Sequence, residues 1–148
     1  INMETNVNIE TAVSKTKSNF KEAKYATGRR KKSIARVWLK KGSGAISVNG
    51  KKVIDYFKKS NLQASVYRPF TLAKRENEYD IRCFVKGGGL TGQAGAIVLG
   101  ISKALVIFEP DLKPTLKKEK LTTRDSRAVE RKKYGRRKAR RSFQFSKR

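Results

Sequence analysis

The sequence lacks histidine and has a single cysteine, Cys83, and these absences exclude several kinds of chemistry. Histidine is the commonest metal ligand and the usual acid–base catalyst near neutral pH. A lone cysteine without histidine argues against a thiol nucleophile or a zinc site, and it excludes an internal disulfide framework. We therefore expect no catalytic residues, no metal site and no enzymatic activity.

Acidic residues are also scarce, because 12 Asp and Glu stand against 37 Lys and Arg, giving a formal net charge of +25. Residues 113–148 carry 16 of these cations and 3 of the acids, and the last fifteen residues carry seven cations and no acid. Such a segment cannot bury itself, since its cations repel each other and its apolar residues are few. A surface this basic usually meets phosphate. The alternative, a solubility tail, is disfavoured because such tails mix signs or are acidic.

The 148 residues divide into three segments by composition. Residues 1–24 are polar and without steady periodicity, and we expect a disordered N-terminal extension. Residues 25–112 carry the patterns of one small globular RNA-binding domain. Residues 113–148 are expected to form a basic C-terminal extension with a short helix and an extended tail. The most apolar run, 94–108, is too short to span a membrane and contains Lys103.

Alternating apolar and polar side chains predict strands over residues 33–40 and 79–86. A shorter strand is expected around Ile46 and Val48, and Asn49-Gly50 is a strong signal for a tight turn. These runs predict a sheet with one face toward a core.

Helical spacing of apolar residues predicts the main core helix over residues 91–108. A single helical turn is expected at 53–57. Residues 62–74 also show helical spacing, but Pro69 should break or begin a helix there. A helix from Ser126 to Tyr134 has no apolar stripe, so it should form only against a partner.

The glycines Gly87, Gly89 and Gly92 fit the pattern G-x-G-x-x-G between a predicted strand and a predicted helix. The pattern is typical of dinucleotide sites, but no further strand follows and the domain is too short, so we expect no cofactor. Backbone amides at a helix N-terminus also suit an RNA phosphate. The remaining alternative is that the glycines only permit a tight turn. We expect that a side chain at Gly89 would obstruct the turn or a close backbone approach.

A second basic cluster, residues 28–32, precedes the first predicted strand and suits contacts with an RNA backbone. The alternative is a solvated sheet edge. Tyr25, Trp38, Phe143 and Phe145 could stack on bases, although for Trp38 a place in the core or in a protein interface is equally supported.

Together these segments resemble the small-subunit ribosomal protein nine family, of bacterial or organellar type. The resemblance runs in order from about Lys24 to Arg148. It rests on YATGRRK at 25–31, VNG at 48–50, GGGLTGQAGA at 87–96, TRDSRAVERKKYG at 123–135 and QFSKR at 144–148. Val98 and Leu99 depart from it, since the family commonly has basic residues there.

The resemblance implies an α+β fold, a small two-layer ribosomal domain with a sheet backed by helices and a long extended basic C-terminal tail. It implies a structural constituent of the small ribosomal subunit, bound to rRNA in the head beside neighbouring head proteins and away from membranes. Its tail would approach the tRNA in the peptidyl site, with Ser146, Lys147 and Arg148 nearest the tRNA. The candidate rRNA-binding residues are Arg29, Arg30, Lys31, Lys32, Arg36, Gly88, Gly89, Gly92, Gln93, Arg124, Arg127, Arg131, Lys132, Lys133, Arg136, Arg137, Lys138, Arg140 and Arg141.

The ending resembles alphaproteobacterial and mitochondrial members of the family. With a first residue that is Ile1 rather than Met and an unmatched N-terminal segment, this favours the mitochondrial matrix, in the mitochondrial ribosome. The bacterial cytoplasm is the alternative location. The competing function is a free-standing basic nucleic-acid-binding regulator, and a small nucleotide-dependent enzyme ranks third.

Overall fold

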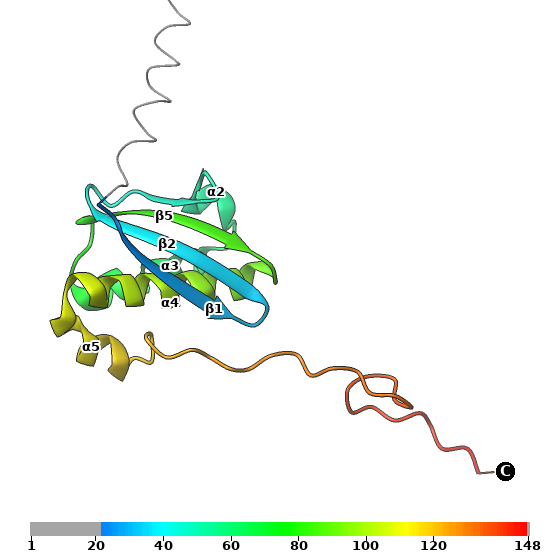
Figure 1. Ribbon diagram of the computed structural model, residues 1–148. Coiled ribbons are helices and arrows are strands. Elements are labelled where there is room, and N and C mark those ends of the chain that lie inside the picture. Colours follow the sequence, from blue (N-terminus) through cyan, green and yellow to red (C-terminus); the bar gives the residue numbers. More distant parts are fainter. Residues whose placement is uncertain (1–21, 148) are drawn as a thin grey trace, which may run out of the picture.

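The computed structural model describes residues 22–147, so the predictions for residues 1–21 and for Arg148 lie outside the described part (Figure 1). Its five strands form one sheet in the order β1-β2-β5-β3-β4. Helices α3 (Ser60–Ala73) and α4 (Leu90–Phe108) pack behind this sheet (Figure 1). The α+β class, with a sheet backed by helices, is confirmed.

The sheet is built around two long strands that the alternation predicted. β2 (Ser33–Lys41) pairs antiparallel with β5 (Tyr79–Lys86), and β3 (Ile46–Val48) runs parallel to β5. The short β4 (Lys51–Lys52) pairs with β3 across the Asn49-Gly50 turn. Val37, Leu39 and Ile81 are fully or almost fully buried, so the predicted inward face is correct.

The core helix α4 crosses β1 and β2 and packs against α3. Ile97, Ile101 and Leu105 are fully buried on its inner face, as the periodicity predicted. By length and composition alone α4 is apolar enough to cross a membrane, but more than half of it is buried inside the protein. Its contacts with the sheet account for the composition as that of a core helix.

Strand β1 (Lys24–Arg30) pairs with β2. The sequence did not predict this strand; it indicated only a basic cluster ahead of the strand over residues 33–40. Its inward positions, Ala26 and Gly28, are too small to display an apolar period. A Cβ at Gly28 would lie 1.8 Å from the carbonyl oxygen of Ala96 on α4. Glycine is therefore required where this strand and this helix touch.

Pro69 lies inside α3, where the sequence predicted a break or a helix start. The helix tolerates the missing amide because Pro69 is itself buried in the core, together with Val66 one turn earlier and Phe70 directly after it. The remaining helical elements are short: α2 (Val53–Tyr56), η1 (Pro110–Leu112) and α5 (Lys113–Lys118).

The core continues past residue 112, since Leu116 of α5 is fully buried. Beyond α5, residues 122–147 contain no helix or strand. The helix expected from Ser126 to Tyr134 is therefore absent from the protein alone. Its formation against a partner stays a prediction.

Candidate nucleic-acid interface

The tip of the β1–β2 hairpin packs against the glycine loop that precedes α4. Lys31 turns the hairpin with a φ of 51°, and Ser33 Oγ donates a hydrogen bond of 2.9 Å to the carbonyl oxygen of Gly87. Gly87 and Gly88 have φ values of 76° and 61°, a region that favours glycine. A Cβ at Gly88 would lie 2.1 Å from Ser33 Oγ. Gly87 and Gly88 therefore allow the glycine loop to pack closely against the β1–β2 hairpin.

Gly89 does not have the role that the sequence suggested. Its φ is −107°, it precedes the first residue of α4, and no heavy atom would lie within 4 Å of an added Cβ. The expectation that a side chain there would obstruct the turn is therefore wrong. The loop positions without room are Gly88 and Gly87, whose Cβ would lie 2.6 Å from the carbonyl oxygen of Lys32. Gly92 is buried, and its Cβ would meet Ser33 Oγ at 2.8 Å. Gly89 directly precedes the first turn of α4, whose free backbone amides suit an anion.

Gln93 uses its side-chain amide within the protein. Tyr56 donates a hydrogen bond of 2.8 Å to Gln93 Oε1, and Gln93 Nε2 donates one of 3.2 Å to the Gly87 carbonyl. Asn49 extends the network by receiving a bond from the Val85 amide and donating one to the Val85 carbonyl. The side chain of Gln93 therefore holds the glycine loop in place through its bond to the Gly87 carbonyl.

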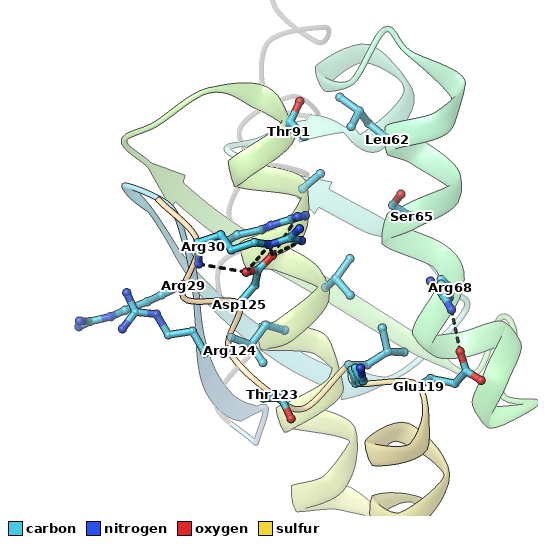
Figure 2. A pocket seen from close by; sticks show the side chains of 17 residues that line it. Arg29, Arg30, Leu62, Ser65, Arg68, Thr91, Glu119, Thr123, Arg124 and Asp125 are labelled. Carbon is cyan, nitrogen blue, oxygen red and sulfur yellow. Dashed lines mark hydrogen bonds and ion pairs between the residues drawn. The ribbon is translucent and has the colours of Figure 1, made fainter. Parts of the chain in front are cut away.

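A groove of about 550 Å³ lies between the end of β1, the outer sides of α3 and α4, and the segment that follows α5 (Figure 2). Leu62, Ala94, Val98, Leu99 and Leu121 supply its apolar lining. The two positions that depart from the family pattern, Val98 and Leu99, belong to this lining. Six cations and two carboxylates line the groove: Arg29, Arg30, Arg68, Lys120, Arg124, Arg127, Glu119 and Asp125. The excess of positive charge suits phosphate groups.

Asp125 ties the C-terminal segment to the domain. Its carboxylate accepts hydrogen bonds from the backbone amide and guanidinium of Arg127. It also accepts one of 3.2 Å from Arg30 Nη2 (Figure 2). The bonds from Arg127, with the nearby charge of Arg30, hold the pKa of Asp125 well below its usual range. Arg30 and Asp125 are 95 residues apart in sequence, so this ion pair fixes where the segment leaves the domain.

Arg30 can reach Asp125 because Gly95 leaves its path open. A Cβ at Gly95 would lie 2.3 Å from Arg30 Cδ and 2.8 Å from Nη1. The guanidinium therefore lies along the backbone of α4. Arg30 Nε is buried there and has no hydrogen-bond partner within the described chain, which leaves a donor for a ligand oxygen or for water.

We call residues 122–148 the basic tail; its described part holds only two carboxylates, Asp125 and Glu130. Glu130 is paired with Lys133 and with Arg140 at 3.0 Å, and these bonds lower the pKa of its carboxyl. Within residues 22–147 the other cations of the tail make no ion pair: Arg124, Arg131, Lys132, Arg136, Arg137, Lys138, Arg141 and Lys147.

The candidate residues thus fall into separate groups. Arg29 and Arg30 at the end of β1, together with Arg124 and Arg127, line the groove. Lys31 and Lys32 are exposed at the hairpin tip beside the glycine loop. The tail, which carries the remaining cations, runs away from the domain (Figure 1). Arg36 lies on the other face of the sheet, because its position in β2 points outward. Arg68 and Asp125 were not among the site residues predicted from the sequence, because their roles in the groove depend on contacts with distant segments.

A small basic α+β domain with a cation-lined groove and an acid-poor tail has the construction of an RNA-binding component of a ribonucleoprotein. The family model described as Ribosomal protein S9/S16 matches residues 28–148, and the chain belongs to this family. Its class is therefore that of structural, non-enzymatic proteins of the small ribosomal subunit. The resemblance drawn from the sequence is confirmed. The family implies rRNA and other ribosomal proteins as partners.

Proposed function

We propose that this protein binds small-subunit rRNA in the head through three surfaces: the groove, the hairpin tip with its glycine loop, and the basic tail. The observation that carries the proposal is the ion pair between Arg30 and Asp125. It sets the start of the tail at the edge of the groove, so that one RNA path can contact the groove and then the unpaired tail cations. Binding would rest on phosphate neutralisation rather than on base readout.

We further propose that the tail approaches the tRNA in the peptidyl site beside neighbouring head proteins. Fifteen extended residues span at most about 50 Å, enough to pass from the domain surface into a distant RNA crevice. Ser146, Lys147 and Arg148 would lie nearest the tRNA. The likeness of the ending to alphaproteobacterial and mitochondrial members supports the mitochondrial ribosome as the location, with the bacterial cytoplasm as the alternative. Family membership favours this role over a free-standing regulator.

The rRNA part is tested with Arg124→Gln, which removes a groove cation that makes no ion pair among the described residues. Each lost phosphate contact should lower the slope of log affinity against log salt by about 0.7 to 0.9. The matched control is Lys103→Gln, because Lys103 is exposed on α4 and does not line the groove. Equal slopes for both variants in a filter-binding assay with a small-subunit rRNA fragment would remove the groove from the proposal.

The tRNA part is tested by comparing small subunits that carry the full chain with subunits that lack residues 146–148. We expect normal rRNA binding but faster dissociation of tRNA from the peptidyl site, with a greater difference at moderate salt. A second variant, Lys147→Gln with Arg148→Gln, keeps the length and removes the charge. Dissociation rates that are equal across a salt series would leave the tail as an rRNA anchor alone.

A further inference from the structure

The sheet face opposite α3 and α4 carries a row of aromatic side chains. Tyr25 on β1, Trp38 on β2 and Phe84 on β5 point outward, and their neighbours Ala26, Val37 and Val85 point into the core. The rings of Tyr25 and Trp38 are 5.1 Å apart between centroids, and those of Trp38 and Phe84 are 5.7 Å apart. No element within residues 22–147 covers this face (Figure 1).

Two arginines alternate with these rings. In the strand register Arg36 stands opposite Phe84, and Trp38 stands opposite Arg82. The Arg36 guanidinium carbon lies 5.9 Å from the centroid of the Trp38 ring, and that of Arg82 lies 5.0 Å from the centroid of Phe84. We call these five residues the aromatic face. Tyr25 is 46% exposed and Phe84 is 36% exposed, so the rings are open to a partner.

The charge around the aromatic face is positive. Lys40 and Lys86 share its side of β2 and β5. The carboxylate on this side of β5 is that of Asp80, which already accepts hydrogen bonds of 2.8 Å and 3.0 Å from the amides of Ser43 and Ala45. A partner here must therefore bring negative charge together with flat apolar groups.

We infer that the aromatic face binds a single-stranded segment of RNA, with bases on the rings of Tyr25, Trp38 and Phe84 and phosphates on Arg36 and Arg82. Bases are flat and stack on aromatic rings without regard to sequence, while arginines between the rings neutralise the backbone. This inference rests on the proposed role in RNA binding but concerns a second surface, on the opposite side of the sheet from the groove. A neighbouring protein is the alternative occupant, and it meets the charge pattern less completely because its flat side chains carry no phosphate beside them.

Trp38 is the single tryptophan of the chain, so its fluorescence reports contact at this face alone. The test titrates the full-length protein with an oligouridine of about eight nucleotides, a length within the range of single-strand sites, and with an abasic oligomer of equal length. We expect quenching of Trp38 by oligouridine and none by the abasic oligomer, although the basic tail binds both. Phe84→Leu and Tyr25→Leu should each reduce the preference for oligouridine over the abasic oligomer by about 5-fold or more, which corresponds to the loss of one stacked base.

The matched control is Phe143→Leu with Phe145→Leu, since these rings are exposed in the tail. The control should keep the quenching and the preference, and circular dichroism should show that every variant is folded. Binding of oligouridine without quenching, or an unchanged preference in Phe84→Leu, would overturn the inference while leaving the groove and tail proposal intact. A blue shift of Trp38 with another head protein, in place of quenching by RNA, would assign the face to that protein. Failure of both oligomers to bind would contradict the proposed function itself.

Discussion

The most informative single substitution is Gly88→Ala, because two separate costs can be read from the structure. Gly88 has a φ of 61°, where an alanine costs about 1 kcal/mol. The new Cβ would lie 2.1 Å from Ser33 Oγ, so Ser33 must turn away and lose its 2.9 Å hydrogen bond to the Gly87 carbonyl. Ser33 is 1% exposed, and a buried polar group without a partner costs about 1 to 3 kcal/mol. We expect a total loss of about 2 to 4 kcal/mol.

Gly89→Ala is the matched control one residue away. It meets no atom within 4 Å and keeps an ordinary φ, so we expect a loss below about 1 kcal/mol from the poorer helix cap. Urea unfolding of the full chain, followed by circular dichroism, measures both variants. Equal destabilisation by the two alanines would refute the reasoning. If Gly89→Ala folds normally and still weakens rRNA binding, a phosphate approaches the start of α4.

Three further predictions concern the buried Leu116, the ion pairs of Asp125 and the thiol of Cys83. Leu116→Ala should lower the free energy of unfolding by about 2 to 5 kcal/mol, because Leu116 is fully buried; the exposed neighbour Lys117, changed to alanine, should cost little, and urea melts compare the two. The pKa of Asp125 is lowered, so its ion pairs contribute above the ordinary Asp pKa of about 3.9 and are lost only as the pH falls through the lowered value. NMR relaxation should therefore show a tail start whose mobility is constant between about pH 8 and pH 5, and greater mobility throughout that range in Asp125→Asn. Burial raises the pKa of the Cys83 thiol, so a thiol reagent should react with Cys83 only at the rate of unfolding, and fast reaction of the folded protein would show that the core is open there.

Strands that alternate strongly could be predicted from the sequence, and a strand with small inward residues could not. Residues 33–40 and 79–86 place an apolar side chain at every second position, and both became strands with the expected inward face. β1 was not predicted because its inward residues, Ala26 and Gly28, have too little apolar surface to produce a visible alternation in the sequence. Pro69 gave the opposite error, because the sequence predicted a break or a helix start there and the helix continues through it. Burial of the surrounding side chains outweighs the loss of one helix hydrogen bond.

The charge of the candidate site was readable from the sequence, but its geometry was not. Clusters of cations in residues 28–32 and 113–148 indicated a phosphate-binding surface. The pairing of Arg30 with Asp125 depends on the fold, because it joins residues 95 positions apart. The roles of Gly88 and Gly89 also depended on the atoms around each residue, which a glycine motif does not specify.

In the proposed role, many phosphate contacts from its groove and tail hold this family member on the small subunit. Sedimentation of purified ribosomal subunits through a high-salt cushion tests it most directly, with the full chain compared to a chain that lacks residues 122–148. We predict that the full chain stays with the small subunit while the truncated chain is lost as salt rises, because each missing cation weakens binding to the RNA. Release of the full chain into the supernatant at the same salt as the truncated chain would contradict the account.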